Sequence, residues 1–441
     1  MSRVLFLTSN GAGLGHVTRC MAIARRMPNG VKPIFFTLSK ALPPVRQQGF
    51  YVEHFPSLKA SGLDSGQWHA RFAAQLSAVV EEYRPAVIAF DGTSPYRGLR
   101  SLIKQQPGPA FVWIRRPMWQ PDVEPHALTF SGLFDRIIEP GEFASPADEG
   151  PTVSRREEAI CVDPITFCDE SELLPRPEAE AQLGLEPGRV HALIQLGEVK
   201  AFERDFLMQA SVTQILRDSE TQIAILESAI SERFVVPPTV RKIAATYPIA
   251  RLYSAFDFVI SAAGYNSYHE LVGFQIPTAF YPVRKVTDNQ AARARYAEDV
   301  GVGVETGLEP AAAIERLLSE AHRGRMKAKA LELKFANGAV RAADEIARLA
   351  RDRGTNPTAS RLARRREQAS GPQGSAAGHL VRLGAATEED LRQIAGIGPV
   401  TARRIIEFRD QRGPISSVQQ LENVTGVGRE MLEVLSARVR P

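Results

Sequence analysis

The feature that most limits the fold of this chain is an alternation of short apolar runs with amphipathic stretches, which occurs twice. In the first half, stretches with helical spacing such as His16–Met27 and Gln67–Tyr83 separate the apolar runs. Those runs are Val4–Thr8, Lys32–Thr37, Pro85–Phe90, Ala110–Ile114 and Arg136–Glu139. Because strands that alternate with helices form βαβ units, this half predicts a parallel sheet covered by helices on both faces.

The same pattern restarts after a polar, proline-bearing segment, Asp163–Gly188. The second set of apolar runs is Val190–Leu196, Gln222–Glu227, Phe258–Ser261 and Pro277–Tyr281. Two successive doubly wound units are the simplest interpretation, so the predicted fold class is α/β with two Rossmann-like domains. A cleft between two such domains is the default place for a binding site.

The domain boundaries follow from composition. A length of 441 residues exceeds what one hydrophobic core usually serves. We place the Rossmann-like domains at residues 1–165 and 166–351. Residues 352–381 carry small and polar residues around three consecutive arginines, which predicts a flexible basic linker. Residues 382–441 then form a small helical domain.

The net charge of +4 lies entirely in the tail, because residues 352–441 contain 14 arginines, no lysine and 10 acidic residues. Such asymmetry is compatible with a polyanionic partner for the tail and with an ordinary solvated surface. No apolar run reaches the roughly 18–20 residues of a membrane-spanning helix, so we predict no transmembrane segment. The N-terminus is too short for a signal peptide, and Cys20, Cys161 and Cys168 form no C-x-x-C pair. We therefore expect a cytoplasmic protein.

The first motif joins the first predicted strand to the first predicted helix and contains Gly11, Gly13 and Gly15, followed by His16. Glycines allow a ligand to approach the backbone closely, and the helix that follows offers free N–H groups. The motif is neither a dinucleotide fingerprint nor a P-loop, because His16 replaces the third glycine and no Gly-Lys-Ser/Thr follows. A histidine here can take a proton from an attacking hydroxyl; a capping or buried structural histidine is the alternative.

The second motif lies between an apolar run and an amphipathic stretch, at residues 261–270. Gly264, Asn266 and Ser267 can form a helix N-terminus whose N–H groups bind a diphosphate. Glu270 lies one helical turn further and can accept hydrogen bonds from both ribose hydroxyls. The motif thus predicts a nucleotide-binding helix end.

Asn289 and Gln290, further along, offer uncharged hydrogen-bonding groups suited to sugar hydroxyls. Together with Gly-Tyr-Asn-Ser-x-x-Glu at residues 264–270 and Ile276-Pro277, they resemble the donor-binding half of GT-B glycosyltransferases. Among these enzymes, the motifs resemble those of the family that contains the peptidoglycan N-acetylglucosaminyltransferase and bacterial UDP-sugar transferases. The loop that ends in His16 is similar to the N-terminal loop of the same enzymes, so the resemblance covers about 350 residues.

The resemblance implies two facing Rossmann-like domains, with the acceptor on the first and the nucleotide sugar on the second. It implies inverting, metal-independent transfer of a sugar from a nucleotide-diphosphate donor, with UDP favoured, to an acceptor hydroxyl. No cofactor is expected, because the nucleotide sugar is itself a substrate. The absence of an Asp-x-Asp triplet agrees with departure of a diphosphate stabilised by a helix end instead of a metal. The identity of the acceptor has no recognisable code.

The resemblance also assigns roles. His16 would be the general base, and Asp91, at the end of an apolar run, would orient it; a strand-end cap is the alternative for Asp91. The diphosphate would be held by Gly264, Asn266 and Ser267, the ribose by Glu270, and the donor sugar by Asn289 and Gln290. Two departures affect the donor site, because Ala262 stands where the plant-type enzymes have a histidine and Asn289 replaces the usual acid.

The tail contains a short repeat, because Leu391–Gly398 recurs as Leu421–Gly428. Each copy ends in a Gly-x-Gly hairpin whose N–H groups can hold a phosphate beside nearby arginines. The candidate residues are Gly396, Gly398, Arg403, Gly426, Gly428 and Arg429. Residues 382–438 resemble the tandem helix-hairpin-helix domain of competence proteins, which implies binding to the backbone of double-stranded DNA; a protein contact is the alternative.

Two other functions compete with sugar transfer. Gly15-His16-Val17-x-Arg19-Cys20 is also similar to a loop of UDP-sugar hydrolases, in which His16 would activate water. The third interpretation is a DNA-associated binding protein that acts through its helix-hairpin-helix domain and carries a degenerate sugar-nucleotide fold.

Overall fold

The computed structural model divides the chain into two compact units, residues 1–124 with 131–357, and residues 125–130 with 358–441. The residues that the structure describes are 2–9, 14–105, 108–197, 199–218, 220–227, 237–244, 246–333, 336–355, 381–384, 386–392, 394, 399–413, 415, 417–424, 427, 432, 435–436 and 439–440. The first unit contains both predicted α/β lobes, and the second contains the tail.

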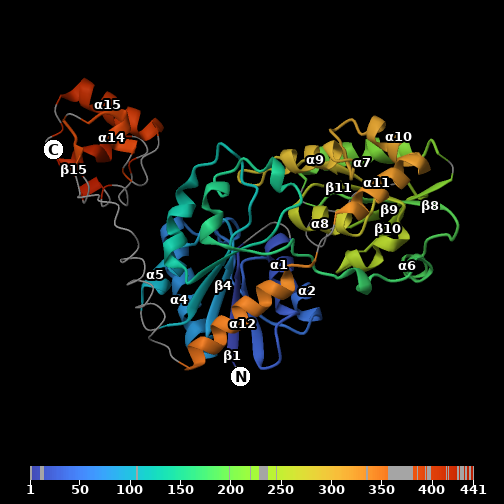
Figure 1. Ribbon diagram of the computed structural model, residues 1–441, viewed down its shortest axis with the longest axis horizontal. Coiled ribbons are helices and arrows are strands. Elements are labelled where there is room, and N and C mark those ends of the chain that lie inside the picture. Colours follow the sequence, from blue (N-terminus) through green and yellow to red (C-terminus); the bar gives the residue numbers. More distant parts are fainter. Residues whose placement is uncertain are drawn as a thin grey trace. The chain divides into compact units, whose positions relative to one another are not determined.

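The first lobe is built on a parallel sheet of seven strands among the described residues (Figure 1). The strands are β1 (Ser2–Thr8), β2 (Val31–Thr37), β3 (Tyr51–His54), β4 (Val87–Asp91), β5 (Ala110–Ile114), β6 (Arg136–Glu139) and β7 (Ile160–Cys161). Their order is β3-β2-β1-β4-β5-β6-β7, so the chain reverses direction across the sheet between β1 and β4. Ligands of doubly wound sheets bind at such a switch point, beyond the carboxyl ends of the strands.

The second lobe repeats this plan with a parallel sheet of six strands within the described part of the chain. The strands are β8 (Val190–Gln195), β9 (Thr221–Leu226), β10 (Arg241–Ile243), β11 (Phe258–Ala262), β12 (Thr278–Tyr281) and β13 (Val304–Glu305). Their order is β10-β9-β8-β11-β12-β13, which places the switch point between β8 and β11. Both sheets therefore have the predicted doubly wound topology, and the predicted fold class is confirmed.

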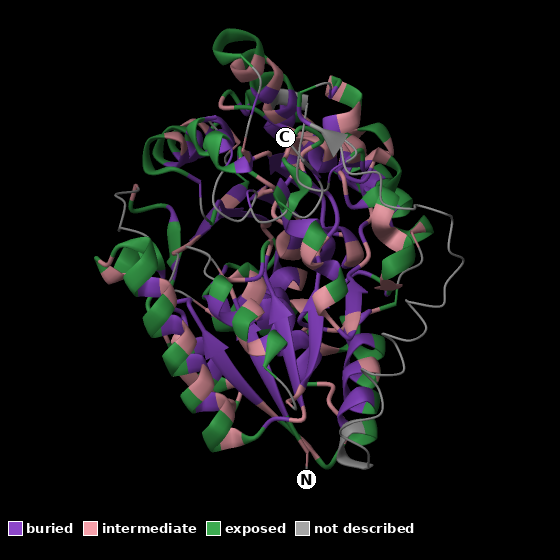
Figure 2. Cartoon of the chain, turned by 90° about the vertical axis from the view of Figure 1, so that its left-hand side faces the viewer, coloured by how far each residue is buried: buried purple, intermediate pink, exposed green. Residues whose placement is uncertain are grey.

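Helices cover the sheets and expose only their outer sides, as Figure 2 shows for the first lobe. In the first lobe they are α1 (Gly15–Ala24), α2 (Leu42–Gln47), α3 (Leu58–Ser61), α4 (Ser65–Tyr83) and α5 (Arg97–Lys104). In the second lobe they are α6 (Arg176–Leu183), α7 (Ala201–Ile215), α8 (Tyr265–Gly273), α9 (Gln290–Asp299), α10 (Ala311–Leu318) and α11 (Glu320–Glu332). Short 3-10 helices are η1 (Pro125–Leu133), η2 (Ser145–Ala147), η3 (Val153–Glu158), η4 (Glu170–Glu172) and η5 (Ile249–Ala255).

The last helix of the body, α12 (Ala339–Thr355), returns to the first lobe. It packs against α1 and against β1, β4 and β5, as Figure 1 shows (orange beside blue). The return requires Gly338, because a Cβ atom there would lie 1.9 Å from the carbonyl oxygen of Asp163. The sequence placed residues up to 351 in the second domain, and the structure assigns this helix to the packing of the first. Apolar residues on one side of α12 complete the core beneath the first sheet.

The second unit has its own apolar core, which includes Leu383, Leu391, Ile405, Leu421 and Leu435. Its described elements are β14 (Val381–Arg382), α14 (Glu388–Arg392), α15 (Pro399–Arg412), η6 (Val418–Asn423) and β15 (Val439–Arg440). Ser417 and Gln420 form a capping box at the start of η6. The predicted linker lies outside the described residues between 356 and 380. No helix in the described ranges is long and apolar enough to cross a membrane.

Candidate active site

The N-terminal half of the candidate site forms at the switch point of the first sheet. Thr8 at the end of β1 pairs in register with Asp91 at the end of β4. The glycine-rich segment follows β1 directly and leads into α1, whose first turn carries His16. Because β1 and β4 are adjacent and parallel, the start of α1 and Asp91 meet at one edge of the sheet. Gly15 belongs to α1, whereas Gly11 and Gly13 lie outside the described residues.

His16 and Asp91 form a close pair, as expected for a base and its orienting acid. His16 Nδ1 lies 2.6 Å from Asp91 Oδ1; the side chain of His16 is 23% exposed and that of Asp91 is 1% exposed. An ionised carboxylate only accepts hydrogen bonds, so Nδ1 donates its proton and Nε2 is the free ring nitrogen. The arrangement can hold the partly exposed imidazole in one orientation.

Arg19 joins this pair, and the sequence did not assign it a role. Its Nε and Nη2 atoms donate to Asp91 Oδ2 and Oδ1 at 2.8 and 2.6 Å, which is a bidentate ion pair. Burial alone would raise the pKa of the Asp91 carboxyl, but the charge of Arg19 and the hydrogen bond from His16 lower it overall. Asp91 is therefore held as a carboxylate. The signal that could have identified Arg19 is its spacing of three residues from His16, which places both on one face of α1.

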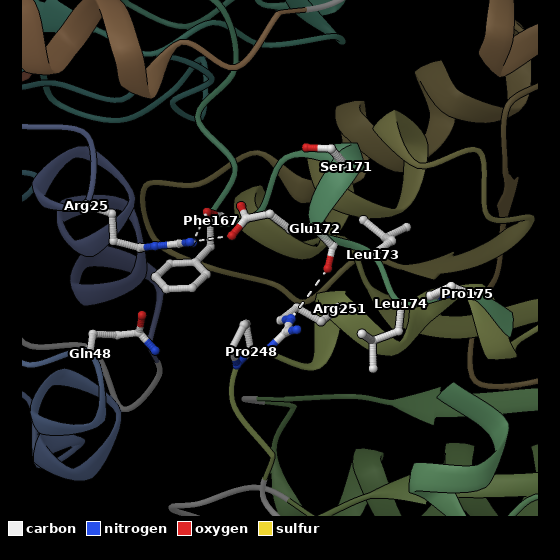
Figure 3. Close-up of a pocket in the computed structure, with 10 residues that line it drawn as sticks. All are labelled: Arg25, Gln48, Phe167, Ser171, Glu172, Leu173, Leu174, Pro175, Pro248 and Arg251. Atoms are coloured by element: carbon white, nitrogen blue, oxygen red, sulfur yellow. Dashed lines mark hydrogen bonds and ion pairs between the residues drawn. The ribbon is translucent and has the colours of Figure 1, made fainter. Parts of the chain in front are cut away.

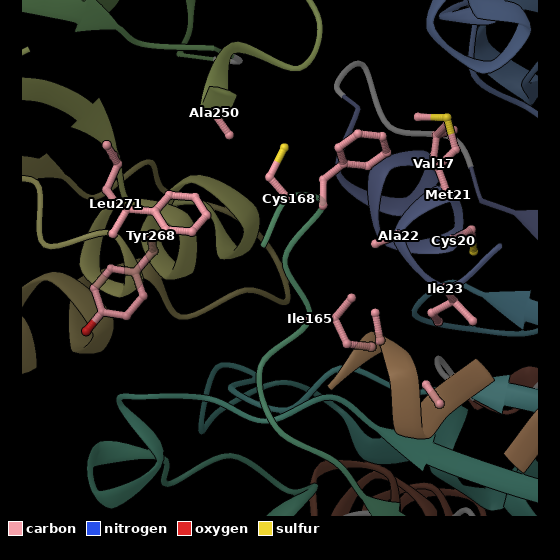
Figure 4. Packing of buried hydrophobic residues seen from close by; sticks show 14 of the residues in the cluster. Val17, Cys20, Met21, Ala22, Ile23, Ile165, Cys168, Ala250, Tyr268 and Leu271 are labelled. Atoms are coloured by element: carbon pink, nitrogen blue, oxygen red, sulfur yellow. The ribbon is translucent and has the colours of Figure 1, made fainter. Parts of the chain in front are cut away.

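The packing of α1 fixes this trio in place. Figure 4 shows the apolar side chains of α1 beside the segment that crosses between the lobes, with residues of the second lobe beyond it. The α1 residues are Val17, Cys20, Met21, Ala22 and Ile23; Ile165 and Cys168 belong to the crossing segment, and Ala250, Tyr268 and Leu271 to the second lobe. These residues belong to one apolar cluster, so the body of α1 is packed against both the crossing segment and the second lobe.

The C-terminal half of the candidate site is the start of α8, at the switch point of the second sheet. Gly264 is the N-cap of α8 and comes directly after the end of β11 and Ala263. The free N–H groups of a helix start suit an anion. Asn266 Nδ2 donates to the carbonyl oxygen of Gly15 at 3.1 Å, and the Arg19 guanidinium lies 5.1 Å from the centre of the Tyr265 ring. The structure therefore brings the start of α1 and the start of α8 together, with Ser267 in the first turn of α8.

Asn289 and Gln290 begin α9 and are partly used within the protein. Asn289 Oδ1 accepts the N–H of Ala292 as the N-cap, at 3.1 Å. Gln290 is 4% exposed; its Oε1 accepts the N–H of Val283 at 3.0 Å, and its Nε2 donates to Asp288 Oδ2 at 3.0 Å. A Cβ atom on Gly264 would lie 3.9 Å from Gln290 Nε2. Gln290 thus adjoins the start of α8.

Glu270 lies on α8 and is 7% exposed. Its Oε1 accepts the backbone N–H of Phe167 at 3.3 Å. Burial raises the pKa of this carboxyl to about 7, and the hydrogen bond from Phe167 offsets only part of the rise. No described arginine or lysine forms an ion pair with Glu270, so the group keeps acceptor capacity for a hydroxyl.

A chain of buried charged side chains, which the sequence did not predict, adjoins the C-terminal half of the candidate site. Arg293, which is fully buried, donates to Glu142 Oε2 from Nε and Nη2 at 3.1 and 2.9 Å. It also donates to Asp288 Oδ1 at 3.2 Å and to the carbonyl oxygen of Ala263 at 2.8 Å. Arg116 of the first lobe pairs with the same Asp288. Separations of up to 172 residues leave no local signal for such a chain.

The charges in this chain balance each other. Burial would raise the pKa of Glu142, yet the neighbouring charges of Arg293 and His269 lower it to about 2. The pKa of Asp288 is lowered in the same way by Arg116 and Arg293, against burial. His269 is fully buried, and its Nε2 lies 3.0 Å from Glu142 Oε1. The chain ties both lobes to the residue that precedes Gly264.

A separate pocket of about 390 Å³ opens at the other end of α1 (Figure 3). Arg25, at the C-cap of α1, donates to the carbonyl oxygen of Phe167 at 2.9 Å and pairs with Glu172. The other lining residues are Gln48, Ser171, Leu173, Leu174, Pro175, Pro248 and Arg251. None of the predicted site residues lines this pocket, so it does not belong to the site around His16.

The tail site is described only in part. Arg403 lies on α15 with its side chain 68% exposed, and its Nε is 3.7 Å from Glu388. The predicted glycines Gly396, Gly398, Gly426 and Gly428, with Arg429, lie outside the described residues. Within the described part of the chain, no group of His, Cys, Asp and Glu residues could hold a metal ion.

Sequence comparisons match parts of the chain. A family model described as "Helix-hairpin-helix motif" matches residues 377–440. The chain is 32% identical over 62 residues to ComE operon protein 1 of Bacillus subtilis (strain 168), covering 14% of this chain and 30% of that protein. It is 30% identical over 148 residues to UDP-N-acetylglucosamine--N-acetylmuramyl-(pentapeptide) pyrophosphoryl-undecaprenol N-acetylglucosamine transferase of Aquifex aeolicus (strain VF5), covering 31% of this chain and 41% of that protein. The chain thus spans less than half the length of either curated relative.

Solved structures match the whole body. A glycotransferase of kitacinnamycin aligns with a TM-score of 0.56 at 16% identity, covering 79% of this chain and 98% of that structure. A spinosyn forosaminyltransferase aligns with a TM-score of 0.54 at 14% identity, covering 84% and 100%. A calicheamicin glycosyltransferase aligns with a TM-score of 0.52 at 17% identity, covering 79% and 98%. The body of this chain therefore has the GT-B fold of glycosyltransferases, and residues 377–440 form a helix-hairpin-helix domain.

Proposed function

We propose that this protein is an inverting glycosyltransferase that moves a sugar from a nucleotide-diphosphate donor to an acceptor hydroxyl. The observation that carries the proposal is the contact between the two halves of the site. His16, held by Asp91, starts α1, and the hydrogen bond from Asn266 to Gly15 joins that start to the start of α8. A proton acceptor and an anion-binding helix end therefore share one site, which is what sugar transfer from a diphosphate requires.

In the proposed reaction His16 Nε2 takes the proton of the acceptor hydroxyl as its oxygen attacks the anomeric carbon. Asp91 keeps Nδ1 protonated and so fixes the orientation of the ring. The bond from the anomeric carbon to the diphosphate breaks on the opposite face, which inverts the configuration. Gly264, Asn266 and Ser267 receive the departing diphosphate at the start of α8.

The nucleotide part of the proposal concerns Glu270. A carboxylate on α8, inside the helix start that receives the diphosphate, is placed to accept hydrogen bonds from ribose hydroxyls. Uridine is favoured because the Aquifex aeolicus relative is named for UDP-N-acetylglucosamine. Asn289 and Gln290 remain the residues proposed for the donor sugar. The proposal includes no metal, so turnover in EDTA should equal turnover in Mg²⁺.

Calorimetric titration with UDP and with uridine tests the nucleotide site. UDP should bind, and uridine should bind far more weakly because it lacks the diphosphate. Glu270→Ala should weaken UDP binding by about 10-fold, the effect of one or two lost hydrogen bonds. Glu332→Ala, an exposed acid on α11, serves as the control. Equal affinity for UDP in Glu270→Ala and the wild type would contradict the ribose role.

A UDP-sugar hydrolase is the second candidate, because Arg19 and Cys20, which carry that resemblance, both contact Asp91. Cys20 Sγ lies 3.8 Å from Asp91 Oδ2, and Arg19 holds both carboxylate oxygens. The two activities differ in the nucleophile. Rapid, stoichiometric release of free sugar from UDP-sugars without any acceptor would establish hydrolysis and contradict the transferase proposal.

The tail is proposed to bind double-stranded DNA, on the basis of the helix-hairpin-helix match and the surplus of arginine. Neutralisation of phosphates releases counterions, so affinity should fall steeply as salt rises. Arg403→Gln should weaken binding and reduce the salt slope by about one unit. Arg295→Gln, on the exposed side of α9, is the matched control. A salt slope unchanged by Arg403→Gln would remove this residue from the interface.

A further inference from the structure

The side-chain amide of Gln290 is fixed in one orientation by two groups of opposite character. Its Oε1 lies 3.0 Å from the backbone nitrogen of Val283, and its Nε2 lies 3.0 Å from Asp288 Oδ2. A backbone N–H can only donate a hydrogen bond, and a carboxylate can only accept one. The reversed amide would set carbonyl oxygen against carboxylate and N–H against N–H. The side-chain amide of Gln290 therefore cannot flip, exchanging Oε1 and Nε2, while Asp288 stays ionised.

Asp288 is itself locked as a carboxylate. Its Oδ1 pairs with Arg116 and with Arg293 Nη2, and the side chain is 11% exposed. Arg293 is anchored in turn to Glu142 and to the carbonyl oxygen of Ala263. Two arginines on one oxygen leave Oδ2 free to serve Gln290.

The atom of Gln290 that adjoins the start of α8 is the nitrogen. Nε2 is the atom that a Cβ placed on Gly264 would approach, at 3.9 Å. An amide nitrogen carries two hydrogens, and Asp288 accepts one of them. The second can be donated to a group bound at the start of α8.

We propose that Asp288 is a specificity-determining positioning residue, which turns the Gln290 amide so that an N–H donor, and not a carbonyl acceptor, faces the donor sugar. The sugar group beside Gln290 is then one that accepts a hydrogen bond: a hydroxyl, carbonyl or carboxylate oxygen. The inference rests on the proposed function, because it assumes a nucleotide sugar bound at the start of α8. It goes further by naming the polarity of the sugar contact and the residue that sets it.

The test compares UDP with UDP-glucose, UDP-galactose, UDP-N-acetylglucosamine and UDP-glucuronic acid by calorimetric titration. The wild type should prefer at least one of these sugars over the others. Asp288→Asn retains the size of the side chain but removes the carboxylate that can only accept a hydrogen bond, so the N–H of Val283 alone orients the Gln290 amide and the preference should shrink by up to about 10-fold, the worth of one directed hydrogen bond. Affinity for UDP itself should change less than threefold.

A second variant keeps the test decisive if Asp288→Asn does not fold. Gln290→Glu replaces the amide N–H by an oxygen beside Asp288, and should remove the same sugar preference. Arg295→Gln, on the exposed side of α9, is the control and should match the wild type for every ligand. An unchanged preference in Asp288→Asn, or in Gln290→Glu where the first variant is unfolded, overturns the inference. Failure of the wild type to bind UDP or any UDP-sugar instead contradicts the proposed function, since no sugar contact would then exist.

Discussion

Both halves of the site pair buried carboxylates with arginines and with a histidine, but only the histidine of the first half is partly exposed. At the start of α1 a carboxylate, Asp91, is shared between Arg19 and His16. Near the start of α8 the carboxylates Glu142 and Asp288 form ion pairs with Arg293. The groups proposed to bind the donor there are the backbone N–H groups of α8 and the side-chain amides of Asn289 and Gln290. The first half thus places a partly exposed histidine beside its buried carboxylate, whereas in the second half Glu142 and Asp288 lie among arginines and the histidine beside Glu142 is fully buried. This difference fits the proposed division between proton transfer in the first half and donor binding in the second.

The largest expected effect, and the strongest test of separate roles for the two halves, comes from substitution of His16. His16→Ala should lower turnover by about 10²–10⁴-fold, the usual contribution of a positioned base, while affinity for UDP stays within twofold. The physical reason is that in the proposed reaction the imidazole acts on the acceptor proton and makes no contact with the nucleotide. Steady-state rates and calorimetric titration measure the two quantities separately. His322→Ala on α11 is the control, and equal losses of rate and affinity in His16→Ala would refute the division.

Substitution of a buried arginine in the C-terminal half of the site should lower the unfolding free energy far more than substitution of an exposed one. Arg293→Met leaves Glu142 and Asp288 without a buried partner, which should cost about 3–5 kcal/mol of unfolding free energy. Arg295→Met on the same helix removes an arginine that is 68% exposed and should cost under about 0.5 kcal/mol. Urea denaturation of both variants measures the difference. Similar values for the two arginines would show that the buried chain contributes nothing beyond a surface pair.

Glu270 should make stability depend on pH. Its folded pKa of about 7 lies above the ordinary value of 4.5, so the folded state binds more protons than the unfolded state between these values. The unfolding free energy contributed by this group therefore falls as pH rises from about 4.5 to 7, by a total on the order of 3 kcal/mol. Glu270→Gln cannot ionise and should be more stable than the wild type at pH 8 but not at pH 4.5. Denaturation at both pH values checks the sign; a variant less stable than the wild type at pH 8 would contradict it.

The residues proposed from the sequence lie close together where they follow strands, whereas the contacts that the sequence did not predict join distant segments. The pairing of His16 with Asp91 was expected from the family resemblance, and in the structure it arises because β1 and β4 are neighbouring strands whose ends lie side by side. The start of α8 was expected directly after an apolar run, which forms β11. Arg293 and Glu142 are 151 residues apart, and no periodicity or spacing links them.

The remaining differences have the same physical origin. The short edge strands β3, β7, β10 and β13 were not predicted, because two to four residues carry little periodic signal. The helix α12 was placed in the second domain because sequence order suggests it, whereas its apolar side packs on the first sheet. Gln290 was expected to bind the donor sugar, and its contact with Asp288 was not predicted: Asp288 is only two residues away, but the arginines that pair with Asp288 come from both lobes.

The smallest expected effect concerns the contact that joins the two halves. Asn266 donates one neutral hydrogen bond to Gly15, and its Oδ1 atom is buried without a partner among the described residues. Asn266→Ala loses the bond but also removes an unsatisfied acceptor, so the unfolding free energy should change by less than about 1 kcal/mol. Turnover should still fall by about 3- to 10-fold, because the start of α1 is no longer tied to α8. A double-mutant cycle with His16→Ala separates the two explanations: if the tie acts through His16, Asn266→Ala lowers turnover in the wild type but not in His16→Ala, whereas additive losses would show that Asn266 acts on the donor alone.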